Sequence, residues 1–329
     1  MKKIVVLLLA LLTSLSTLFL SGCTEGASTD EIVISVPDGA PALAVYKMLD
    51  EKGKIGGYDV KINIVSGTEE IATQITSGES DVCVMPTNLA TKLYNKGVDV
   101  KLASVNVFGV LYMIGSQPIT SLNDLLGKVI VYTGAGGTPE LTLQIIFDKN
   151  NIEYVQSETA VEGKVAITAV TAGSDAIKSV KLGKADYAVL GEPVVTQANK
   201  NLGTSVVLDL QQEWAKIIGE NSYTQAGVVL SKSVYDKNVF VRGLMEQLSL
   251  NSEYLLNNYE GVKETLKNSG SALSVDFTEE TVKRLNIGHK TAVDAKEGLE
   301  KYLNALYEYN PNLIGGKMPD EGFYLAYEK

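Results

Sequence analysis

The sequence has 329 residues, of which 29 are basic and 39 acidic, for a formal net charge of −10 at pH 7. An acidic chain without a basic stripe repels phosphate backbones, so we expect no binding to nucleic acid. A single histidine argues against a histidine-based metal site and against a Ser-His-Asp triad, and two cysteines argue against a disulfide framework. No cofactor is expected.

The first residues have the pattern of an export signal. Lys2 and Lys3 precede an apolar run over residues 4–20, which is followed by LSGC. This order is typical of a secretory signal peptide, which we assign to residues 1–22. Because the run is close to the shortest length that spans a membrane, an uncleaved anchor helix is the alternative. Either interpretation predicts that the rest of the chain is exported.

The cysteines are expected to have different roles. Ser21 and Gly22 before Cys23 resemble the lipobox of bacterial lipoproteins, in which the cysteine receives diacylglycerol. We therefore expect Cys23 to anchor the protein to the extracytoplasmic face of the cell membrane, with residues 23–30 as a flexible tether. Cys83 would then have no partner, and its place in the apolar run VCVM predicts a buried free thiol.

Beyond the tether, apolar β-branched runs alternate with helical patterns. The runs predict strands at 31–36, 59–65, 81–85, 127–132, 165–170, 186–190, 204–210 and 225–231. Helices are predicted at 41–53, 69–78, 87–97, 139–151, 174–183 and 193–201, followed by two long helical regions at 235–268 and 278–309. Nearly all-apolar strands that alternate with helices predict an α/β fold with helices on both faces of the sheet.

One unit of the sequence occurs twice. The stretch GESDVCVMPTNLATK is matched by GKADYAVLGEPVVTQ, so that Gly78, Asp81, Val84 and Thr91 return as Gly183, Asp186, Val189 and Thr196. Three successive strand–helix units also follow in the same order in both halves, although chance similarity between two such units is the alternative. We expect two similar lobes, the first from 31–110 and 223–329 and the second from 111–222, with crossings near 106–113 and 221–228.

The candidate site follows from this arrangement. In sheets of this kind ligands bind outside the carboxyl ends of the strands, and helix starts there offer free N–H groups. The residues at these ends are mostly small, hydroxylated or glycine. The predicted ligand-binding residues are Asp38, Gly39, Ala40, Ser66, Gly67, Thr68, Thr87, Asn88, Gly134, Gly137, Thr138, Ser174, Asp175, Glu192 and Gln225.

The charges near these ends bear on the class of solute. The two arginines, Arg242 and Arg284, fall in the C-terminal helical region, so an arginine clamp on a sulfonate is not expected. Asp38, Asp175 and Glu192 would repel an anion unless they cap helices. Since Glu192 aligns with Thr87 in the repeat, we predict that it accepts a hydrogen bond from an amino group of the solute, the alternative being a hinge or surface carboxylate.

These features together resemble a known family. The export signal with its lipobox, the two lobes and the segment VTAGSDAIKSVKLGKADYAVLGEP are similar to type II periplasmic binding proteins. TGAGGTPEL resembles the second-lobe loop of their sulfonate, nitrate and thiamine-precursor branch, which comprises solute receptors of ABC importers. The resemblance implies a two-lobed Venus-flytrap fold, a small solute trapped between the lobes, an ABC permease with its ATPase as partners, and a monomer.

Two other functions stay open at this point. An exported sensor without a transport role would need the same site. An enzyme on the same fold is the second alternative, since the pyrimidine synthase of thiamine biosynthesis resembles these receptors. That enzyme depends on histidine chemistry, and His289 lies away from every predicted strand end.

Overall fold

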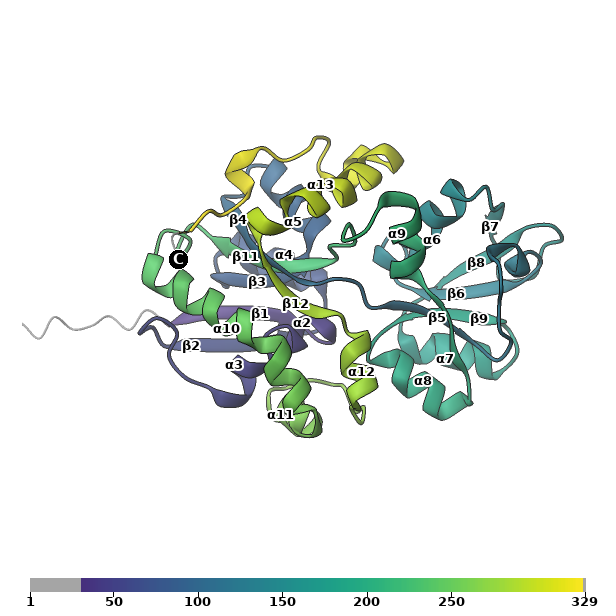
Figure 1. Ribbon diagram of the computed structural model, residues 1–329, viewed down its shortest axis with the longest axis horizontal. Coiled ribbons are helices and arrows are strands. Elements are labelled where there is room, and N and C mark those ends of the chain that lie inside the picture. Colours follow the sequence, from purple (N-terminus) through teal and green to yellow (C-terminus); the bar gives the residue numbers. More distant parts are fainter. Residues whose placement is uncertain (1–30, 328–329) are drawn as a thin grey trace, which may run out of the picture. The chain divides into compact units, whose positions relative to one another are not determined.

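The structure is a computed structural model that describes residues 31–327. The predicted signal peptide, Cys23 and the tether lie outside the described residues. From Ile32 onward the chain forms one compact unit, and within the described range this unit contains two six-stranded sheets. The two sheets with their helices are called the first and the second lobe (Figure 1).

The first sheet takes its strands from both ends of the chain. Its strand order is β12-β4-β11-β3-β1-β2, in which β1 pairs in parallel with β2 and β3, while β11 and β12 run antiparallel to their neighbours. The strands are β1 (Ile32–Pro37), β2 (Val60–Val65), β3 (Val82–Pro86), β4 (Val100–Val107), β11 (Ala226–Ser231) and β12 (Ile287–Thr291). Its helices are α2 (Ala40–Leu43), α3 (Tyr46–Glu51), α4 (Thr68–Ser77), α5 (Thr87–Asn95), α10 (Asn238–Asn257), α11 (Val262–Asn268), α12 (Glu279–Arg284) and α13 (Ala292–Tyr309).

The second sheet is built from the middle of the chain. Its strand order is β10-β5-β9-β6-β8-β7, in which β6 is parallel to β8 and β9 and β5 is antiparallel to β9. Five of these strands, β8-β6-β9-β5-β10, repeat the pattern of β2-β1-β3-β11-β4 in the first sheet. The strands are β5 (Leu111–Gly115), β6 (Val129–Thr133), β7 (Tyr154–Gln156), β8 (Val165–Val170), β9 (Tyr187–Gly191) and β10 (Ser205–Asp209). The helices are α6 (Thr138–Lys149), α7 (Gly173–Lys181), α8 (Val194–Leu202) and α9 (Leu210–Ile218). The expectation of a two-lobed α/β fold is confirmed.

The repeated unit has the same structural role in both lobes. Asp81 follows α4, and its carboxylate accepts a hydrogen bond from Val33 N on the neighbouring strand at 3.0 Å. Asp186 follows α7 and accepts from Val129 N at 2.9 Å. In both cases the aspartate N–H also donates to the carbonyl of the same partner residue. The recurring aspartate therefore fixes a parallel strand pair at the centre of each sheet.

The repeat also explains how each lobe joins the chain crossings. The first residue after the central strand is Thr87 in one lobe and Glu192 in the other. Thr87 N donates to Gln225 O at 3.0 Å, and Glu192 N donates to Val110 O at 2.9 Å. Each central strand thus ends against one of the two segments that connect the sheets.

A continuous core joins the two lobes through α13. One hydrophobic cluster contains Leu102 of β4, Ile130 of β6 and Phe147 of α6, together with Trp214 of α9 and Leu303 of α13. The first lobe has a further cluster under α3 and α10, and the second has one under α7 and α8. Cys83 lies on β3 inside the shared cluster with no exposed surface, as expected, and burial raises the pKa of its thiol to about 12.

Three predicted helices differ from the structure. The region 278–309 contains the strand β12, so His289 lies on a strand and not on a helix. The region 235–268 is broken at Asn258–Gly261, and the helix at 41–53 is split at Ala44 and Val45. β12 forms because β4 offers a free edge, and antiparallel pairing there overrides the weak local helical preference.

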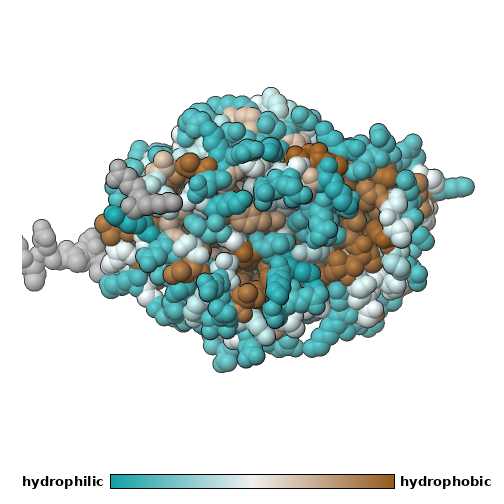
Figure 2. Space-filling model, in the orientation of Figure 1, coloured by the Kyte–Doolittle hydropathy of each residue, from teal (hydrophilic) through white to brown (hydrophobic). Residues whose placement is uncertain are grey.

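The face of the molecule in Figure 2 is largely hydrophilic, with hydrophobic residues showing mainly over the second lobe. Leu126 and Leu182 of that lobe are among the exposed large hydrophobic residues. Single exposed hydrophobic residues are normal on a soluble surface. No helix within residues 31–327 is long and apolar enough to cross a membrane.

Candidate functional site

Three helices that follow strand ends have a hydroxyl side chain in their first turn. Thr68 begins α4 after β2, Thr138 begins α6 after β6, and Ser174 is the second residue of α7 after β8. Thr68 and Ser174 are exposed, and Thr138 is half-buried. The first N–H groups of a helix have no partner within it, so each of these starts can donate hydrogen bonds to a bound molecule.

In each of these helices an acidic side chain accepts a hydrogen bond from the loop that precedes the helix. Glu70 accepts from Ser66 N at 3.2 Å and from the Ser66 hydroxyl at 3.0 Å. Glu140 accepts from Gly136 N at 2.6 Å, and Asp175 accepts from Ala172 N at 3.3 Å. Asp175 is therefore a helix-capping carboxylate, one of the two possibilities that the sequence left open. Within the described residues none of the three acids forms an ion pair, so they add negative charge beside the helix starts.

Glycines occupy the loops that follow β1, β2 and β6. Gly39 after β1 and Gly134 after β6 have φ of 108° and 76°, values that L side chains rarely adopt. A Cβ atom added at Gly67 or Gly134 would meet nothing within 4 Å, whereas one at Gly137 would lie 3.1 Å from Gly134 O. The loops after β2 and β6 therefore border open space, and Gly137 closes the turn into α6.

The expectation that Asp38 binds solute does not fit its contacts. Its carboxylate accepts hydrogen bonds from Gly39 N at 3.0 Å, from the Ser271 hydroxyl at 2.5 Å and from Ala272 N at 2.8 Å. These three donors hold Asp38 to a loop of its own lobe. Ala40 is buried, with 4% of its surface exposed, and serves the core rather than the surface of the site.

Residues at the crossings form a second group. Thr87 is fully buried, and its hydroxyl donates to Thr224 O at 2.6 Å. Gln225 accepts from Val110 N at 3.1 Å and so links the two crossing segments. Both residues contact the crossing segments. Asn88 differs, because its Oδ1 is buried and has no hydrogen-bond partner in the described structure. An unsatisfied buried acceptor costs about 1–3 kcal/mol, so Asn88 is the predicted site residue that most needs an outside donor.

Glu192 is the clearest departure from the predicted site. Its side chain has no exposed surface, and Arg284 Nε donates to Glu192 Oε1 at 2.6 Å. Thr196 contributes its N–H and its hydroxyl, each at 3.1 Å. The carboxylate is already satisfied in this structure, so the prediction that it accepts from an amino group of the solute does not agree with the geometry.

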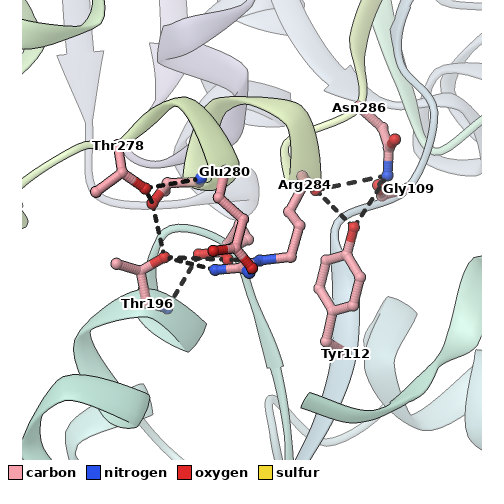
Figure 3. A network of polar contacts seen from close by, with 9 residues as sticks. Gly109, Tyr112, Thr196, Thr278, Glu280, Arg284 and Asn286 are labelled. Atoms are coloured by element: carbon pink, nitrogen blue, oxygen red, sulfur yellow. Dashed lines mark hydrogen bonds and ion pairs between the residues drawn. The ribbon is translucent and has the colours of Figure 1, made fainter. Parts of the chain in front are cut away.

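Arg284 is the residue of this group whose contact with Glu192 the sequence analysis did not predict. It ends α12, and Figure 3 shows it between Thr196 of the second lobe and Asn286 of the first. Its other nitrogens donate to Thr196 Oγ1 at 3.1 Å and to Glu280. A useful signal was its residue type, because arginine is favoured over lysine for buried ion pairs and the chain has very few arginines.

The described residues contain no group of histidine, cysteine, aspartate or glutamate that could hold a metal ion. His289 is half-buried on β12, where burial lowers the pKa of its imidazole, and Asn106 Nδ2 lies 3.3 Å from its Nδ1. Two hollows, of about 670 Å³ beside Phe108 and Tyr223 and of about 480 Å³ beside Lys52 and Ile62, lie elsewhere on the surface. No predicted site residue lines either of them.

Comparison with known proteins agrees with the architecture. A family model described as NMT1/THI5 like matches residues 54–163. The structure of an ABC transporter protein from Parabacteroides distasonis aligns with a TM-score of 0.76 at 22% identity, covering 89% of this chain and 98% of the other. The sulphonate-binding protein SsuA from Escherichia coli aligns at 0.67 and 13% identity, covering 91% and 93%.

A Candida albicans protein described as having the generic periplasmic binding protein fold aligns at 0.56 and 12% identity, covering 89% of this chain and 93% of the other. The chain has the periplasmic-binding-protein fold. No curated protein matches the sequence significantly. One segment of the chain contacts both strand ends, since Ser271 bonds to Asp38 after β1 and Arg284 bonds to Glu192 after β9.

Proposed function

We propose that this protein is a lipid-anchored, extracytoplasmic solute receptor of an ABC importer, which traps a small polar solute between its lobes. The observation that carries the proposal is the pair of matching lobes. In both lobes helices begin directly after strands, with Thr68, Thr138 and Ser174 in their first turns. Two lobes that each supply half of the donors bind a solute when they close. The solved structures that share the fold include proteins named as transporter components and sulfonate-binding proteins.

The charges favour a solute that donates hydrogen bonds, such as an amine or a nitrogen heterocycle. Asn88 Oδ1 lacks a donor, and Glu70, Glu140 and Asp175 have no cationic partner among residues 31–327. Arg284 is engaged by two carboxylates and is not available to clamp an anion. A zwitterion such as taurine or an aminopyrimidine meets these conditions better than nitrate does.

A thermal-shift screen tests the proposal. Taurine, alkanesulfonates, nitrate and aminopyrimidines are each added to the purified protein, and the unfolding temperature is measured. We expect an amine-bearing compound to stabilise the fold, by about 2.7 kcal/mol at one hundred times its dissociation constant. Small-angle scattering should then show a radius of gyration no larger than that of the solute-free protein.

The same screen can overturn each part of the proposal. Stabilisation by nitrate or methanesulfonate, without any effect of the amines, would contradict the amine-bearing solute. A hit that the protein converts into product would show an enzyme on this fold. If extracts of small molecules retained by the purified protein contain no solute and nothing in the panel stabilises it, the receptor function loses its support.

The membrane anchor has a separate test. Because LSGC ends at Cys23, we expect the Cys23→Ala variant to accumulate as an unprocessed precursor or to leave the membrane fraction. Labelling cells with a radioactive fatty acid should mark the wild-type protein and not the variant. Cys83→Ala is the matched control and should keep the label, since Cys83 is buried in β3. An unlabelled wild-type protein would contradict lipid anchoring.

A further inference from the structure

One segment reaches from the first lobe to the second. Residues 269–286, called the strap, follow α11 and lead into β12 of the first sheet. Val275, Phe277, Val282 and Leu285 bury the strap in the hydrophobic core of the first lobe. The strap therefore moves with the first lobe.

The other face of the strap contacts the second lobe. Arg284 Nε lies 2.6 Å from Glu192 Oε1, and the hydroxyls of Thr281 and Thr196 are 3.0 Å apart. Tyr112 of β5 donates its hydroxyl to Arg284 O at 2.8 Å. Figure 3 shows the Arg284 side chain pointing toward Thr196 and the Tyr112 hydroxyl pointing toward the backbone of Arg284. Every one of these contacts joins residues of different lobes.

The central ion pair is shielded from water. The Glu192 side chain has no exposed surface, and 20% of the Arg284 side chain is exposed. Salt screens such a pair far less than a surface pair, and the two donors from Thr196 satisfy the rest of the carboxylate. A second interlobe pair, Lys200 with Asp276, is exposed and is expected to contribute little.

The pair lies beside the crossing at residues 109–112, because Tyr112 donates its hydroxyl to Arg284 O and Asn286 Nδ2 donates to Gly109 O, so a change in the angle between the lobes would act on it directly. The carboxylate belongs to the second lobe and the guanidinium to the first, and the first lobe leaves no other cation within hydrogen-bond distance of Glu192 in the described structure. We propose that the Arg284–Glu192 pair is a latch that holds the lobes closed when no solute is bound.

The latch is tested by measuring a distance between the lobes. The full chain carries Cys23→Ser, with spin labels at Glu69→Cys on α4 and Lys178→Cys on α7, both exposed positions. Cys83 is buried and should not be labelled. Retained solute is removed by unfolding and refolding, because a bound solute would also close the lobes. Double electron–electron resonance then gives the distribution of distances between the two spin labels.

We expect one narrow, short distance with Arg284 in place. Arg284→Gln should add a longer distance and lower the ratio of closed to open molecules at least tenfold. Lys283→Gln is the matched control, because it removes a neighbouring positive charge of α12 that pairs, among residues 31–327, with Glu279 of the same helix alone. The control should keep the wild-type distribution.

Two further variants keep the test decisive. Adding Glu192→Gln to Arg284→Gln should cause no further opening, since the pair is already broken. If Arg284→Gln does not fold by circular dichroism, Glu192→Gln alone decides, because it removes the carboxylate of the pair and leaves Arg284 paired with Glu280. An unchanged distribution in the folded variant, or a broad one in the wild type, would overturn the latch.

The proposal does not depend on the identity of the solute. If neither the thermal-shift screen nor the extracts of retained molecules reveal a solute and the distances still respond to Arg284→Gln, the latch stands and the receptor function loses its support. If a solute is found and the distances do not respond, the receptor function stands and closure is driven by the solute alone.

Discussion

Replacing Trp214 by alanine is expected to lower the free energy of unfolding by about 3–5 kcal/mol. Trp214 of α9 is fully buried, and its ring centroid lies 5.3 Å from those of Tyr223 and Tyr302. Its indole N–H donates to the Ser222 hydroxyl at 3.1 Å. The alanine variant would leave a cavity where α9, the second crossing and α13 meet. Guanidinium unfolding followed by far-ultraviolet circular dichroism measures the loss.

Two controls separate packing from general sensitivity. Trp214→Phe keeps most of the ring area and should lose clearly less stability than Trp214→Ala. Tyr307→Ala, at a position that is 37% exposed on α13, should stay within about 0.5 kcal/mol of the wild type. A loss below about 1 kcal/mol for Trp214→Ala would contradict the tight packing of this junction.

The repeated aspartates give the second large expected effect. Asp81→Ala removes the acceptor of Val33 N and also the partner of the Ser233 hydroxyl. A hydrogen bond to a charged group contributes roughly 1.5–3 kcal/mol, and the free energy of unfolding should fall by about that amount. Asp186→Ala should have the same sign and a smaller size, because the Asp186 side chain is 41% exposed.

The matched variants are Asp81→Asn and Asp186→Asn. Each keeps an oxygen that can accept from the strand N–H, so each should lose less stability than the corresponding alanine variant. Chemical unfolding of all four proteins gives the comparison. If the alanine and asparagine variants of Asp81 are equally stable, the hydrogen bond to Val33 is not what fixes this strand pair.

Much of the fold could be predicted because the pattern is local. The apolar runs that became β1, β3 and β9 are buried on both faces, and buried strands are recognisable from composition alone. Strands β4 and β5 were not assigned, since one apolar stretch runs through both and does not show where one sheet ends. β12 was predicted as helix, because its strand conformation depends on pairing with β4, far away in the sequence.

The site could be predicted by position but not by contact. Helix starts at Thr68, Thr138 and Ser174 follow strands, and this order is visible in the sequence. The partners of the carboxylates are not visible, since Asp38 bonds to a residue 233 positions away and Glu192 to one 92 positions away. Patterns in the nearby sequence do not indicate which of several acidic residues an arginine will pair with.

The position of the indole ring has a practical consequence for spectroscopy. The sequence contains one tryptophan, so all tryptophan emission comes from a single site. That site lies on α9 of the second lobe, against Tyr302 of α13, which packs on β4 of the first lobe. A rotation of one lobe against the other would alter the surroundings of this ring and hence its fluorescence. The protein therefore carries a built-in optical reporter, with which opening and closing can be followed in stopped-flow experiments without any added dye.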